Sequence, residues 1–172
     1  MADDKKVGSD EPVMGPDNIG EVVAEGIWHR VTEDGIHVYT VTTMTWEPLE
    51  KWLEAVVRLV EGAPKDSVLR IVFDISRVRI FKVSSSLRYG AGGEYNAVDV
   101  TTLGFTWELN GKIRAVLVDN PSFKVFLALV LSTRWSAQIT RVSDQPGILY
   151  QRKLFGDLGS GIAWLKGVEK PK

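Results

Sequence analysis

The sequence predicts an α/β domain in which helices pack on a mixed sheet of four to five strands. Short stretches rich in β-branched residues alternate along the chain with stretches whose apolar residues recur at helical spacing. The 172 residues are enough for one sizeable core, and 44% hydrophobic with 25% charged residues is ordinary for a globular protein. We expect one folded domain over residues 23–168, with a terminal tail at 1–22 and another at 169–172.

The N-terminal tail differs from the rest of the chain in charge. Residues 1–26 contain seven acidic residues and two lysines, a sum of −5, so residues 27–172 carry +4 of the total of −1. Residues 1 to about 20 have almost no large apolar side chain, which predicts disorder. The net charge is too small to favour nucleic acid or an anionic membrane.

A β-hairpin opens the domain. Ile27–Val31 and Ile36–Val41 alternate and are rich in β-forming residues. The Asp-Gly pair at 34–35 favours a two-residue turn, because both positions accept a positive φ. With that turn, His29 and His37 lie on opposite faces of the hairpin, so we expect ordinary strand histidines and no shared metal.

A helix follows the hairpin. Thr45 is the expected N-cap, and Pro48 suits the first turn, where a missing N–H costs little. Gly62 and Pro64 are expected to end the helix. One apolar stripe at helical spacing indicates that the helix packs on the sheet; its members are Leu49, Leu53, Val56, Val57 and Val60.

Two apolar runs that end in aspartate are predicted to be central parallel strands. They are Val68–Asp74 and Ile113–Asp119. Asp74 and Asp119 would then lie near each other at the carboxyl edge of the sheet, either as a carboxylate pair for acid-base work or Mg²⁺ binding, or as caps of the following turns.

The last third of the chain is expected to hold two helices and a strand. Asn120-Pro121 would start a helix over Phe123–Trp135, which is apolar nearly all round. Leu149–Phe155 is predicted to be a peripheral strand. Asp157 caps a closing helix that stops at Gly167. We also expect a helix at Ser85–Tyr95 and either a strand or a connection at residues 138–142.

Three short motifs suggest a family. Val72–Phe81 places Asp-Ile-Ser-x-Val behind a strand, Ala115–Pro121 contains a second strand with Asp-Asn-Pro, and Leu154–Asp157 precedes Ala163-Trp164-Leu165. Together they resemble the STAS domain of bacterial anti-sigma-factor antagonists, whose wider sporulation-antagonist-like fold also includes lipid-binding CRAL-TRIO domains. The resemblance covers about residues 27–168 and implies a STAS-like sheet with helices packed on it. The closing motif departs from the family because Ala163 directly precedes Trp164.

The resemblance also points to a serine-rich segment. In the antagonists, a serine after the Asp-Leu-Ser strand starts a helix and is phosphorylated by a partner kinase. The matching stretch here is Lys82–Leu87, in which Ser84 or Ser85 is the candidate phosphosite. The family's acidic residue and glycine are absent from this stretch. A helix cap that needs no further function is the simpler role of these serines.

Two further groups of residues are candidates for binding. A basic run without acids between Asp74 and Glu94 could contact an anion or an acidic partner, or form a solvated face; its members are Arg77, Arg79, Lys82 and Arg88. An apolar group could line a ligand pocket or be buried in the core; its members are Phe123, Phe126, Leu127 and Val130.

The function expected from the sequence is a non-enzymatic, cytoplasmic regulatory module that binds another protein, such as a kinase or an anti-sigma-type regulator. No Ser-His-Asp set, cysteine or phosphate-binding loop is apparent, so we expect no catalytic residue, metal or cofactor. The alternative is a module that binds a lipid or another small apolar ligand, peripherally at a membrane. No apolar run approaches the roughly 20 residues of a transmembrane helix.

Overall fold

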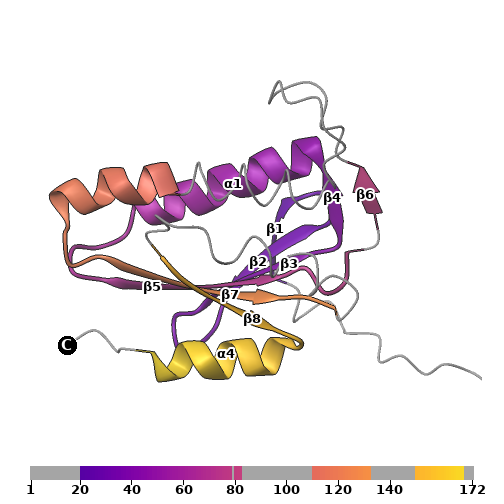
Figure 1. The fold of residues 1–172 in the computed structure, drawn as a ribbon. Helices are drawn as coiled ribbons and strands as arrows, with labels where there is room; N and C mark the ends of the chain where they lie inside the picture. The colour runs from indigo at the N-terminus through magenta and orange to yellow at the C-terminus, as the bar shows by residue number, and fades with distance from the viewer. Residues whose placement is uncertain (1–19, 79, 83–109, 133–149, 169–172) are drawn as a thin grey trace, which may run out of the picture.

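A mixed sheet of six strands forms the middle layer of the fold (Figure 1). This computed structural model describes residues 20–78, 80–82, 110–132 and 150–168. One face of the sheet carries α1 (Trp46–Glu61) and a helix at residues 110–119, and the other face carries α4 (Leu158–Gly167). The predicted α/β class and mixed sheet are therefore confirmed, but the sheet has six strands where four to five were expected.

The strands stand in the sheet in the same order as in the chain, β1-β2-β3-β5-β7-β8. β1, β2 and β3 pair antiparallel, and β3, β5, β7 and β8 pair parallel. Because each parallel strand is added on the same side of the previous one, right-handed crossovers place α1 and the 110–119 helix on one face. The strands are β1 (Glu21–Ala24), β2 (Ile27–Val31), β3 (His37–Val41), β5 (Val68–Asp74), β7 (Lys124–Val130) and β8 (Gln151–Phe155).

A second, two-stranded sheet lies beside the first turn of α1. β4 (Thr43–Thr45) pairs parallel with β6 (Ile80–Lys82). The ladder matches Thr43 with Ile80 and Thr45 with Lys82. This small sheet fixes the backbone that follows β5 next to the start of α1.

α1 has the predicted position and length. Thr45 is the N-cap residue with extended backbone, although its side chain makes no capping hydrogen bond, and Gly62 N–H donates to the Arg58 carbonyl at the other end. Leu49, Trp52 and Val56 are at most 5% exposed. Each such side chain contributes about 2 kcal/mol by leaving water, so the apolar stripe holds the helix on the sheet.

Two apolar cores lie on the two faces of the sheet. The larger core joins α1, the 110–119 helix and the α1-side residues of the strands, with Tyr39, Trp52 and Phe73 in mutual ring contact. The smaller core lies under α4 around Leu165. A side chain at Gly161 would meet Val130 and Ala128 at 3.3 and 3.4 Å, so this position sets how closely α4 approaches β7.

The prediction for Ile113–Asp119 was wrong, because residues 110–119 form a helix. Ile113 is 1% exposed, whereas Val118 is 78% exposed, so the run has one buried side and one open side. Asn120 N–H donates to the Val116 carbonyl in the last turn. Asn120 therefore follows the end of this helix and does not cap the start of a helix, as was expected.

The helix predicted over Phe123–Trp135 was also wrong. Residues 124–130 form the strand β7, between β5 and β8. Every residue from Val125 to Val130 is buried, because helices cover both faces of a central parallel strand. Such burial on both sides produces the continuous apolar run that we interpreted as a buried helix.

The remaining elements agree with the sequence in kind and differ in extent. β5 has its predicted bounds, and β8 starts two residues later than expected. β1 begins at Glu21, inside the segment predicted to be a tail. Asp157 caps α4 through a 2.8 Å bond from the Ser160 N–H. The expected elements at Ser85–Tyr95 and 138–142 lie outside the described residues.

Candidate functional site

Four parallel strands end at one edge of the sheet, where open α/β sheets usually place their sites. β3 ends at Val41, β5 at Asp74, β7 at Val130 and β8 at Phe155. The parallel registers match Thr40 with Asp74, Asp74 with Val130, and Val130 with Phe155. The segments that follow these strands therefore meet at this carboxyl edge.

A tight turn follows β5 at the centre of the edge. Asp74 is 3% exposed, and its Oδ1 accepts hydrogen bonds from the Ser76 N–H at 3.1 Å and from the Ser76 hydroxyl at 2.5 Å. Ile75 N–H donates to the Val130 carbonyl at 3.0 Å, and Val78 N–H donates to the Ile75 carbonyl. These bonds fix the Asp-Ile-Ser turn against β7, so the backbone leaves the sheet in a defined direction.

Arg77 follows this turn and is exposed. The backbone of Lys82 lies in β6, opposite Thr45 at the start of α1. Of the predicted basic group, Arg77 is thus on the surface of the carboxyl edge, and the backbone of Lys82 is held beside α1. Ser84, Ser85, Arg79 and Arg88 lie outside the described residues.

The suggested pair of Asp74 and Asp119 does not form. Asp74 ends β5, whereas Asp119 is exposed at the end of the 110–119 helix. The next residue, Asn120, accepts a hydrogen bond from the Asp66 N–H just before β5 begins. The two aspartates therefore lie at opposite edges of the sheet. The seven residues of β5 separate these edges by about 20 Å, because a strand rises about 3.3 Å per residue.

The opposite, amino edge contains a clamp that the sequence did not reveal. Asn120 is 7% exposed, and its side chain accepts from the Asp66 N–H at 3.1 Å and donates to the Pro64 carbonyl at 3.4 Å. Asp66 has a positive φ of 59°, which is uncommon outside glycine. The clamp ties the end of the 110–119 helix to the turn before β5, a contact between residues more than 50 positions apart.

The prediction that His29 and His37 lie on opposite faces was wrong. Gly35 has a φ of 71°, and Thr32 N–H donates to the Ile36 carbonyl, so the loop has three residues. The register matches Val31 with His37 and His29 with Tyr39. A change of one residue in the loop reverses the face of every side chain on one strand, and so brings both rings to the α1 side.

The two histidine rings are in direct contact. His29 Nε2 lies 3.1 Å from His37 Nδ1, and the Tyr39 ring lies 4.5 Å from the His29 ring. Burial lowers the pKa of His29, although the negative charge of Glu21 opposes this change. Burial and then the charge of His29 lower the pKa of His37 to about 4. Burial raises the pKa of Tyr39 to about 12.

The four predicted apolar contact residues all belong to β7 or the residue before it. Phe123 and Leu127 lie in the core under α1, and Phe126 and Val130 lie in the core under α4. Each is at most 4% exposed. Their apolar character is accounted for by a strand buried on both faces, which separates them into two cores.

The described residues contain no group of three or more His, Cys, Asp or Glu side chains that could hold a metal ion. Within the same residues, no helix is long and apolar enough to cross a membrane. No protein-family model matches this chain, and no curated protein and no solved structure is significantly similar to it.

Proposed function

We propose that this chain is a non-enzymatic, STAS-like module that binds a regulatory protein partner through the carboxyl edge of its sheet. The observation that carries the proposal is the turn at Asp74–Ser76, which is hydrogen-bonded to β7 and leads into β6 beside α1. In the antagonists that the sequence resembles, the regulated serine follows the equivalent strand.

The strand order supports an interaction module over a nucleotide-binding enzyme. Doubly wound α/β folds bind ligands in the crevice where the strand order reverses. Here the described strands of the large sheet follow the chain from β1 to β8 without a reversal, and α1 and the 110–119 helix lie side by side on one face (Figure 1). The edge instead offers short turns and an exposed cation, Arg77, which suit contact with an acidic surface.

The first test is the covalent state of the serine-rich segment. The full chain, purified from its own cells, would be analysed by intact mass and by tryptic mapping. Cleavage after Lys82 and Arg88 isolates the peptide Val83–Arg88. We expect phosphate on Ser84 or Ser85. Unmodified peptide under every growth condition would contradict regulation at these serines.

The second test is partner binding. The full chain would be immobilised, and proteins retained from a lysate of its own cells would be crosslinked and identified. We expect Arg77→Glu to weaken retention of the partner about tenfold, because a rim charge is reversed. Arg114→Glu is the matched control, since Arg114 is also exposed but lies on the 110–119 helix. Equal retention by both variants would contradict a partner site at the carboxyl edge.

A further inference from the structure

The hydrogen bond between His29 and His37 has a geometry suited to sharing a proton. The two ring planes differ by only 5°, and the ring centroids are 5.3 Å apart. This centroid distance is close to the 3.1 Å between the nitrogens plus the radii of the two rings. The rings therefore lie edge to edge in nearly one plane, with His29 Nε2 and His37 Nδ1 facing each other.

The same geometry is unsuited to a metal ion. A tetrahedral zinc ion lies about 2.0–2.1 Å from each nitrogen, to one side of the line that joins two nitrogens 3.1 Å apart. A bound metal would therefore need the two lone pairs to converge at an angle. A proton in an N–H···N bond needs them to point at each other, as they do here.

The number of protons on the pair determines whether this bond exists. With both rings neutral, one donates and the other accepts. With one proton added to His29, its Nε2–H still donates to His37 Nδ1, so the bond is kept and becomes charge-assisted. A second proton places an N–H on both facing atoms and two positive charges side by side, so the bond is lost.

We propose that the His29–His37 pair is an acid-sensitive latch between β2 and β3, which stays closed when it binds one proton and opens when it binds a second. The latch lies next to the edge strand β1, whose Glu21 is directly opposite His29. Opening would loosen β1 and β2 first, because they lie at the edge of the sheet, where β1 pairs with β2 alone within the described residues.

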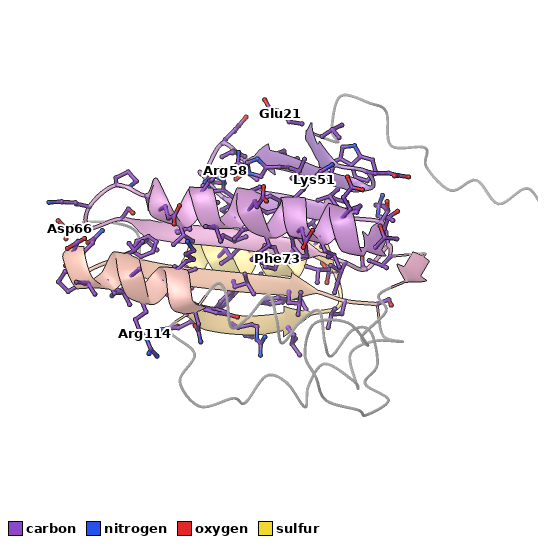
Figure 2. All side chains as sticks on the ribbon, turned by 90° about the horizontal axis from the view of Figure 1, so that it is seen from above. Glu21, Lys51, Arg58, Asp66, Phe73 and Arg114 are labelled. Atoms are coloured by element: carbon purple, nitrogen blue, oxygen red, sulfur yellow. The ribbon has the colours of Figure 1, made fainter. Side chains whose placement is uncertain are left out.

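The groups around the pair leave Glu21 as its main electrostatic partner. The negative charge of Glu21 raises the pKa of His29, and the charge of His29 lowers the pKa of His37. Tyr39 stacks on His29 and stays neutral, and Ile71 of β5 is opposite His37. On α1, four exposed charged residues form the ion pairs Glu47–Lys51 and Glu54–Arg58, and Figure 2 shows Lys51 and Arg58.

The direct test is nuclear magnetic resonance of the ring nitrogens of the unmodified full chain between pH 8 and pH 3.5. We expect two separate steps, with His29 gaining its proton before His37, and broadening of β2 and β3 signals at the second step only. Titration of both rings as independent groups near pH 6.5 would overturn the latch. So would a second step that leaves the β2 and β3 signals unchanged.

The pH dependence of the folding equilibrium is a second test of the latch. The pKa of His37 is lowered on folding, so the unfolded chain binds more protons and stability falls as the pH drops from about 6.5 towards 4. We expect the folding equilibrium constant of the wild type to fall about tenfold more across this window than that of His37→Phe, after discounting for partial exposure. Glu21→Gln should move the first proton step to lower pH. Equal pH dependence in the wild type and His37→Phe, or no movement in Glu21→Gln, would contradict the proposal.

Discussion

A single buried amide joins two turns at the amino edge of the sheet. The Asn120 side chain bonds to Asp66 and Pro64, which lie across the junction between the 110–119 helix and β5. We expect Asn120→Ala to lower the free energy of unfolding by about 1–3 kcal/mol, because partly buried backbone groups lose their partner. Urea unfolding would measure it. Asp119→Ala, at an exposed neighbour, should change stability by less than about 0.5 kcal/mol; an equal loss would contradict the clamp.

Gly26 and Gly35 both have a positive φ, but only Gly26 is crowded, so alanine at the two positions distinguishes the cost of backbone strain from that of steric crowding. Gly26 and Gly35 have φ values of 72° and 71°, but a Cβ on Gly26 would lie 2.5 Å from Thr43 Oγ1, while one on Gly35 meets nothing within 4 Å. We expect Gly35→Ala to cost about 1 kcal/mol for the left-handed backbone alone. Gly26→Ala should cost at least about 1 kcal/mol more. Thermal unfolding of both variants checks the order, and equal losses would show that Thr43 moves aside freely.

At the residue scale, local signals were predictable and register was not. The cap at Asp157 was predicted because its hydrogen bond to Ser160 needs only residues close in sequence. The contact of His29 with His37 was missed because it depends on whether the Asp-Gly turn has two or three residues. The loop length decides on which face of the sheet His37 lies, and the composition of the hairpin does not reveal the loop length.

At the scale of elements, the apolar stretches after residue 110 were assigned to the wrong structures. Ile113–Asp119 contains β-branched residues, which favoured a strand, yet its less exposed positions Ile113, Val116 and Leu117 have helical spacing. β7 was expected to be part of a helix because Asn120-Pro121 precedes an all-round apolar run, although its seven residues have the length of a strand. Tertiary burial decided both cases, since a central parallel strand is apolar on both sides.

The helix at 110–119 predicts a different effect of substitution at Ile113 and at Val118. Ile113 is 1% exposed, and Val118, five positions later, is 78% exposed. Ile113→Ala should destabilise the chain by about 2–5 kcal/mol, while Val118→Ala should be neutral or slightly stabilising through its helix propensity. Urea unfolding of the two variants distinguishes the elements. A loss of more than about 1 kcal/mol in Val118→Ala would contradict this phase of the helix.

At the scale of the whole molecule, stability is concentrated in the middle of the sheet. β5 and β7 have paired neighbours on both sides and helices on both faces. Within the described residues, β1 and β8 are paired on one side only. Exposed ion pairs such as Lys166–Asp34 add little to this arrangement.

Hydrogen exchange should therefore divide the sheet into a slow centre and faster edges. We expect backbone amides of β5 and β7 to exchange at rates set by global unfolding, and those of β1 and β8 to exchange at least about tenfold faster through local opening. Native-state exchange followed by nuclear magnetic resonance resolves the strands separately. Slowest exchange in β1 would contradict this ordering, and would point to a partner strand along its open side.

The match between strand order and chain order has a consequence for how the protein is made. During synthesis, each parallel strand that leaves the ribosome finds the strand it must pair with already in place, from β3 through β8. None of the described strands waits for a later one to be inserted between its neighbours, so this sheet can grow outward as the chain lengthens. α4 emerges after β8 and then packs across β5, β7 and β8, closing the face of a sheet that was assembled before it.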